Sequence, residues 1–131
     1  YANLDAIGTI AVPFTVPRQG VIQSATHFDR SDNADLAVDL WLFRSQIALQ
    51  TDNSAFSVTD GIHLTALTRI SFTTAGDAAL NRLYEVKNIG KAYVLDCQEE
   101  WGTLYAFAQA RSAFVVATGP ILPRFTLDIL V

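Results

Sequence analysis

The sequence predicts a single all-β domain, a β-sandwich or jelly roll of about eight antiparallel strands with one or two short helical turns. Three observations support this fold class. Apolar and polar residues alternate along most of the chain, which is the period of a strand. Turn-forming segments separate most of these runs. The alternation of strands and helices that is typical of a parallel sheet is missing from the sequence.

The length and composition fit one domain. The chain has 131 residues, and we expect residues 1–131 to form a single β-sandwich. A chain of this length buries roughly two thirds of the surface of its unfolded form, so it can fold without a disulfide or a structural metal. The hydrophobic share is 50% and the charged share only 17%. The small charged share favours contacts between subunits, although a monomer with a large core fits it equally well.

The first strands are predicted in the N-terminal third of the chain. Residues 7–16 form a strand that is interrupted by Pro13. Because proline cannot donate a hydrogen bond to a neighbouring strand, Pro13 indicates a sheet edge or a bulge. Residues 20–29 form the next strand. We expect it to pair with residues 35–43 as a hairpin, because the polar segment 30–34 is rich in residues that bond their own backbone.

Residues 35–43 show the cleanest alternation in the chain. Trp41 and Phe43 share one face of this strand with Asp35 and Asp39. Large aromatic side chains are unexpected on a face that also carries two carboxylates. We therefore expect the two aromatic residues to lie under a loop or in a subunit contact. The opposite face is predicted to face the core, and it carries Leu36, Val38, Leu40 and Leu42.

The middle of the chain is less regular. Residues 45–55 are predicted to form a loop, and residues 59–67 hold a short helical turn. Residues 70–72 return to a strand. Residues 76–80 are expected to form a second short helix or a turn.

The C-terminal part again has the period of strands. Residues 83–87 and 91–97 are predicted strands on either side of a turn at 88–90. Residues 103–111 form a clear strand, and residues 125–131 form the last one. The predicted core face of strand 103–111 carries Leu104, Ala106, Ala108 and Ala110.

Electrostatic patterning disfavours two classes of partner. The formal net charge is −4 and the isoelectric point is about 4.9, with scattered basic residues. Nucleic acids and anionic membrane surfaces both require a basic face, so we expect neither as a partner. No apolar run reaches the ~18 residues of a membrane-spanning helix.

No metal or cofactor site is expected. Residues 29–35 are rich in Asp and Asn, but a calcium loop would need Gly at position 34 and Glu at position 40, where the chain has Ala34 and Leu40. A hairpin turn is therefore favoured there. His27 is expected to be a hydrogen-bonded surface residue, and a metal site with His63 is disfavoured. Cys97 is the only cysteine and has acidic neighbours, which disfavour the thiolate.

Three carboxylates and two aromatic residues lie close together in the sequence. Asp96, Glu99 and Glu100 would suit glycosidase chemistry if a cleft held them together, but a solvated loop is favoured. Trp101 and Tyr105 are either core caps or a platform for stacking against a sugar. We expect no catalytic residues.

Arg111 and Arg124 flank the last predicted loop. Arginine forms bidentate ion pairs readily, so these two side chains are expected to pair with carboxylates across a subunit boundary.

Six segments stand out as strand motifs in a definite order along the chain. They are residues 20–25 (GVIQSA), 37–43 (AVDLWLF), 51–56 (TDNSAF), 70–72 (ISF), 103–111 (TLYAFAQAR) and 125–130 (FTLDIL). In this order they resemble the strand motifs of a family of small tailed-phage virion proteins. Each motif alone is weakly specific, but their joint order covers nearly the whole chain. The chain departs from the family at Trp41, where members usually carry a smaller residue.

The resemblance implies a phage virion structural protein without enzymatic activity. The specific expectation is a capsid decoration (cement) protein, a homotrimer on the capsid surface that binds across subunits of the major capsid protein. The alternatives are a tail or fibre component, a carbohydrate-binding module and, least favoured, a glycosidase using Asp96 and Glu100. The candidate subunit or capsid contacts are Trp41, Phe43, Trp101, Tyr105, Arg111 and Arg124.

Overall fold

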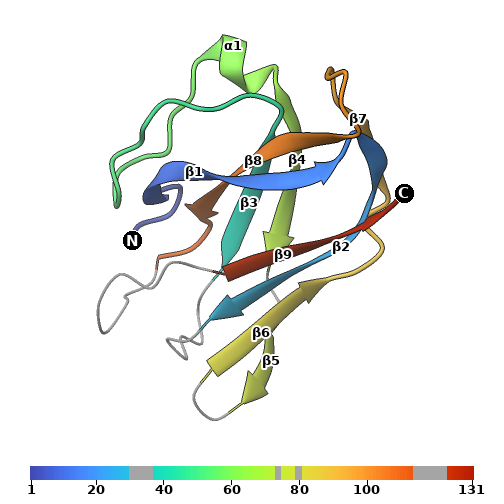
Figure 1. The fold of residues 1–131 in the computed structure, drawn as a ribbon. Helices are drawn as coiled ribbons and strands as arrows, with labels where there is room; N and C mark the ends of the chain where they lie inside the picture. Colours follow the sequence, from blue (N-terminus) through green and yellow to red (C-terminus); the bar gives the residue numbers. More distant parts are fainter. Residues whose placement is uncertain (30–36, 73–74, 79–80, 114–123) are drawn as a thin grey trace.

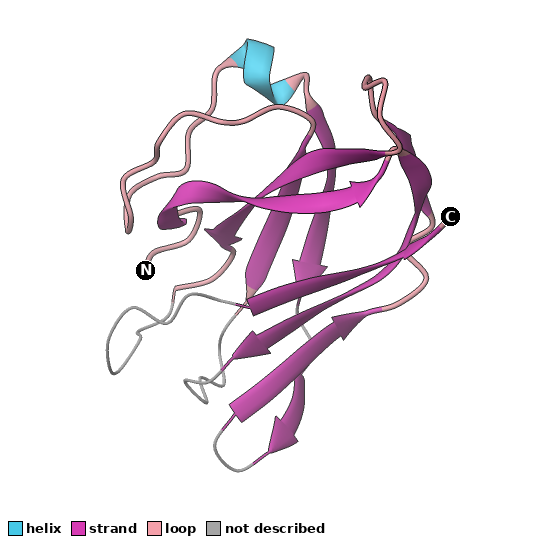
Figure 2. Cartoon of the chain, in the orientation of Figure 1, coloured by secondary structure: helices cyan, strands magenta, loops and turns pink. Residues whose placement is uncertain are grey.

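The structure, a computed structural model, describes residues 1–29, 37–72, 75–78, 81–113 and 124–131. These residues form two antiparallel sheets packed face to face and one short helix, so the predicted β-sandwich is confirmed (Figures 1 and 2). The elements are β1 (Ala6–Pro17), β2 (Gln19–Asp29), β3 (Val38–Phe43), α1 (Asp60–His63), β4 (Ala66–Phe72), β5 (Ala75–Ala78), β6 (Asn81–Val86), β7 (Lys91–Val94), β8 (Trp101–Ala110) and β9 (Arg124–Leu130).

The first sheet has the strand order β1-β8-β3-β4. β3 lies inside it, with Leu40 opposite Ala108 on one side and opposite Ile70 on the other. β1 is an edge strand, and its register with β8 shifts between Ile7 and Val12. Pro13 therefore lies on a sheet edge next to an irregular stretch, as predicted.

The second sheet is built around β2. β9 pairs with residues 21–28 of β2 along one side. β7 and β6 share the other side, where β7 pairs with residues 19–22 and β6 with residues 25–29. β5 then pairs with the outer side of β6. This sheet is therefore four strand positions wide, like the first.

Two predictions about individual strands are wrong. β2 and β3 do not form a hairpin, because β2 belongs to the second sheet and β3 to the first. The predicted turn at 30–34 lies outside the described residues. Residues 76–78 of the short helix or turn expected at 76–80 belong to strand β5 instead, and residues 79–80 lie outside the described residues. Alternation shows which face of a strand is buried, but it does not identify the pairing partner.

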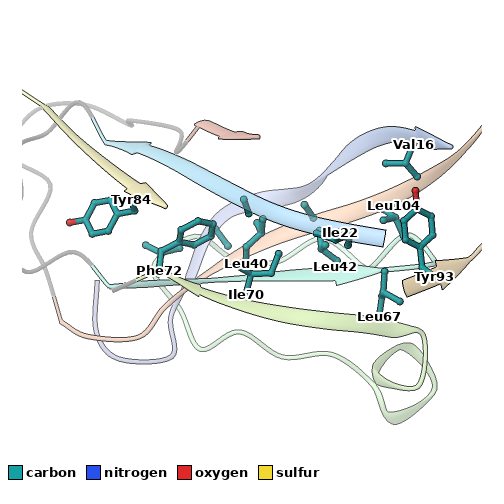
Figure 3. Close-up of a cluster of buried hydrophobic side chains, with 14 of the residues drawn as sticks. Val16, Ile22, Leu40, Leu42, Leu67, Ile70, Phe72, Tyr84, Tyr93 and Leu104 are labelled. Atoms are coloured by element: carbon teal, nitrogen blue, oxygen red, sulfur yellow. The ribbon is translucent and has the colours of Figure 1, made fainter. Parts of the chain in front are cut away.

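The main core lies between the two sheets (Figure 3). The predicted core face of β3 is confirmed at Val38, Leu40 and Leu42, each at most 1% exposed. Leu36 lies outside the described residues. The second sheet contributes Tyr84 and Tyr93, with Phe125, Leu127 and Ile129 of β9 partly buried. The predicted core face of β8 is also confirmed, at Leu104, Ala106, Ala108 and Ala110.

Candidate contact surfaces

Trp41 and Phe43 point to the outer face of the first sheet, where the chain between β3 and α1 covers them. Phe43 is 0% exposed and packs with Ile47 and Phe56 of this covering segment. The rings of Phe43 and Phe56 are 6.5 Å apart between centroids. Of the two positions that the sequence allowed, Phe43 takes the one under a loop. Its side chain is closed to a partner, which corrects its assignment as a contact.

Backbone hydrogen bonds attach the covering segment, residues 44–58, to β1. Ala6 donates its N–H to the carbonyl of Ser54 at 2.7 Å, and Gln50 donates to the carbonyl of Thr9 at 2.9 Å. The ring of Phe56 stacks on Phe107 of β8 at 4.9 Å. The first half of β1 is therefore covered along its outer edge by residues of the same chain.

Trp41 is half-buried and held by polar groups. Its Nε1–H donates to Oε1 of Gln109 at 2.8 Å, and Nε2 of Gln109 donates to the carbonyl of Leu4 at 3.2 Å. The guanidinium of Arg69 lies 5.6 Å from the centre of the indole ring, and the His63 ring meets it edge-on at 5.5 Å. These contacts fix the indole from several sides, and only part of it remains open to a partner.

The carboxylate of Asp39 is buried between two arginines on the outer face of the first sheet. Nε of Arg69 lies 3.6 Å from Oδ2, and Nε of Arg111 lies 3.6 Å from Oδ1. The Asp39 side chain is 4% exposed, whereas those of Arg69 and Arg111 are 54% and 38% exposed. Arg111 therefore has its carboxylate partner within the chain. This corrects the expectation of an ion pair across a subunit boundary.

Exposed apolar side chains gather at the end of the sandwich where β1 passes into β2. Trp101 is 57% exposed and lines a recess of about 530 Å³ together with Pro17 and Val131. Val94 and Leu130 lie opposite residues at the start of β2 and are also exposed. We call Val94, Trp101, Leu130 and Val131 the Trp101 patch. A group of exposed apolar residues of this kind is typical of a protein contact site.

The geometry gives little support to a sugar-stacking platform or to a cleft that would hold the three carboxylates together. Tyr105 packs, half-buried, against the cluster around Phe43, whereas Trp101 belongs to the patch at the end of the sandwich. Asp96, Glu99 and Glu100 are exposed in the segment before β8, as a solvated loop predicts. Within the described ranges, no three His, Cys, Asp or Glu side chains are grouped so that they could hold a metal ion.

His27 is buried, which corrects its expected place on the surface. It is 1% exposed and lies in the main core among the rings of Phe72, Tyr84 and Phe125. Its Nδ1 has no hydrogen-bond partner among the described residues. Burial lowers the pKa of His27 from 6.5 to about 4, and the neighbouring Asp29 carboxylate opposes this shift.

A groove of about 660 Å³ opens between the edges of the two sheets, between β1 and β9. Asp52 and Arg124 supply charges at its rim. Asp52 already accepts hydrogen bonds from the N–H of Gly8 and the hydroxyl of Tyr1, whereas Arg124 is exposed at the start of β9. On the opposite side of the sandwich, β4 and β6 contact each other. The apolar lining includes Ile7, Val12, Phe14, Leu40, Ala106 and Phe125.

Comparison with known proteins finds no matching family model, no matching curated protein and no matching solved structure. In the part of the chain that the structure describes, no helix is both long and apolar enough to cross a membrane.

Sequence reasoning missed several residues that define these surfaces. Phe56 and Arg69 contact Trp41 or Phe43, and Gln109 bonds Trp41. Phe56 and Gln109 lie in segments 51–56 and 103–111 of the resemblance, but those segments do not indicate these contacts, and Arg69 lies in no motif. Asp39 gave one signal, a carboxylate within a strongly apolar strand. Its arginine partners come from other strands or their ends, and only the folded chain brings them together.

Proposed function

We propose that this protein is a non-enzymatic structural component of a phage particle, a capsid decoration protein that binds as an oligomer across subunits of the major capsid protein on the capsid surface. The observation that carries the proposal is the Trp101 patch, because exposed apolar groups on a small sandwich mark a protein contact site. The motif order along the chain adds the phage context.

Trp101 is the best candidate for a strong contact within this patch. Tryptophan is enriched among residues that dominate binding energy, particularly where a recess surrounds the ring. Trp101 lines its recess with Arg18 and Glu99, which would form a polar rim around the apolar centre. Repetition of this contact over a symmetric shell would multiply a weak single contact into strong overall binding.

The test is co-sedimentation of the purified protein with empty tailed-phage capsids. We expect the wild type to co-sediment and Trp101→Ala to lose at least about tenfold in affinity, the scale of a strong interface contact. Leu64→Ala is the matched control, because Leu64 is 85% exposed, lies beside α1 and should leave capsid binding unchanged.

Two other results would contradict the decoration role. Binding to isolated tails without binding to capsids would support the tail or fibre alternative. Binding to a glycan array that is lost in Trp101→Ala, with no binding to capsids, would support a carbohydrate-binding module.

A further inference from the structure

β9 has the least protected edge among the described strands. It is paired with β2 on one side, and no described strand pairs with its other side. Residues 124–130 contain no Pro, Gly or Lys, and the two charged residues of this edge, Arg124 and Asp128, have opposite signs. A long, regular and unprotected edge is a template for adding another strand.

Three of the other described edges are blunted. β1 carries Pro13, an irregular register and the covering segment along its first half. β5 and β7 have only four residues each. β4 is as long as β9 and also lacks Pro, Gly and Lys. Its exposed charge, Arg69, is engaged by Asp39 and Trp41, so β4 offers no free pair of opposite charges to a second copy. β9 is therefore the edge best suited to pairing between molecules.

The geometry points to a second copy of this chain as the partner, with β9 of each copy paired antiparallel about a two-fold axis at Thr126. In this register Arg124 lies opposite Asp128 of the second copy, and symmetry forms the same pair again. Thr126 lies opposite its own symmetry mate, which is a favourable cross-strand pair. The two four-position sheets would thereby join into one continuous sheet.

The alternation of β9 supports this register. Arg124, Thr126, Asp128 and Leu130 are exposed, whereas the intervening residues are partly buried against the core. Residues directly opposite in an antiparallel pair point to the same side of the sheet, so a two-fold axis through Thr126 keeps exposed residues beside exposed ones. Phe125 would then lie opposite Leu127 of the second copy, on the apolar face.

Charge selects this register over its neighbours. An axis at Asp128 would place two carboxylates opposite each other, and an axis at Leu127 would place Arg124 opposite Leu130. Among the residues that the structure describes, none forms an ion pair with Arg124. Asp128 accepts one hydrogen bond, from the hydroxyl of Ser24 at 2.5 Å, and its carboxylate retains acceptor capacity.

The pairing of β9 with a second copy does not depend on the proposed function. Only the use of the resulting dimer on a phage particle rests on that proposal. An isologous contact produces dimers, whereas the resemblance implies trimers, so the mass in solution decides between them. The experiment is sedimentation velocity over a concentration series for the wild type, Arg124→Asp, Asp128→Arg and the double variant that exchanges the two charges.

We expect the wild type to be a dimer. Each single variant places like charges opposite each other twice, and its dimer dissociation constant should rise about tenfold or more. The double variant restores both pairs with reversed polarity and should recover the dimer. Arg44→Asp is the matched control, because it makes the same charge change at an exposed position after β3 and should leave the dimer intact.

A wild type that is monomeric or trimeric would overturn the inference. So would single variants that remain dimeric, or a double variant that is folded by circular dichroism and stays monomeric. The capsid experiment tests a separate claim, the decoration role. A monomer that co-sediments with capsids would overturn the β9 contact and leave the decoration role, whereas a dimer that ignores capsids would do the reverse.

Discussion

The imidazole of His27 stacks on the ring of Phe125, with the two ring centroids 4.7 Å apart. Tyr84 stacks at 5.4 Å, and Phe72 meets the imidazole edge-on at 5.8 Å. These rings come from both sheets, so the histidine lies in the apolar space that joins them. Water cannot solvate a charge there, and the fold consequently stabilises the neutral imidazole.

Stability should therefore fall as the pH is lowered through the range between the two pKa values of His27. The folded-state pKa is about 4 and the ordinary value is 6.5. Between them the unfolded chain binds a proton that the folded chain does not, so the free energy of unfolding drops as the pH falls. The loss between pH 7 and pH 4 should reach about 3 kcal/mol for this residue alone. Urea denaturation at a series of pH values measures it.

His27→Leu separates this effect from the protonation of carboxylates, which occurs in both proteins. The variant should lose about 3 kcal/mol less than the wild type over the same pH range. His63→Gln removes the other histidine, which is exposed, and should keep the wild-type loss. Equal pH dependence in His27→Leu and the wild type would contradict the prediction.

The two arginines at Asp39 should behave non-additively. Arg69→Gln and Arg111→Gln should each destabilise the fold by about 1 kcal/mol or less, because each arginine is partly exposed and the other one still compensates the carboxylate. The double variant leaves a buried carboxylate without either cation. It should lose roughly 3 kcal/mol, more than the sum of the single losses. Chemical denaturation of the four proteins measures this coupling, and simple additivity would count against it.

The two tryptophans should differ in their access to solvent. Trp101 is 57% exposed, whereas Trp41 is half-buried and hydrogen-bonded to Gln109. In Trp41→Phe the remaining fluorescence comes from Trp101, and acrylamide should quench it strongly. In Trp101→Phe the remaining fluorescence comes from Trp41 and should be quenched less. The reverse order would contradict the arrangement described for the outer face of the first sheet.

Removal of the Phe56 ring should loosen the covering segment and leave the main core intact. Phe56→Ala loses the stack on Phe107 and should destabilise the fold by about 2 kcal/mol. Amide exchange should accelerate at Gln50 and Asn53, whose N–H groups bond to β1. Amides of β3 should keep their protection. Phe56→Leu is the control that retains most of the apolar volume.

The inner faces of the central strands could be predicted from the sequence, because apolar residues recur at every second position on the side that meets the main core. Leu40 and Leu104 show this. β2 breaks the pattern, because its register with β9 shifts between Ile22 and Ser24. Ile22 and Ala25, three positions apart, are both buried as a result. The extra residue of β2 reverses the face to which the following side chains point, and nothing in the local sequence indicates this change.

The candidate site was less predictable, since its residues meet only through long-range pairing. Trp101 is exposed, and its assignment as a contact residue stays a prediction. Phe43 and Arg111 turned out to be occupied within the chain, by Phe56 and Asp39. Local sequence shows that a strand has an unusual outer face. It does not show whether the same molecule or another one covers that face.

The positions of the two chain ends give the sandwich a definite mechanical character. Tyr1 and Val131 lie at opposite ends of the molecule in Figure 1, and β9 runs toward the C-terminal end beside β2. Tension between these ends would pull β9 along its own length, so that its hydrogen bonds to β2 carry the load together and cannot open one at a time. A sandwich loaded in this way resists stretching along that direction.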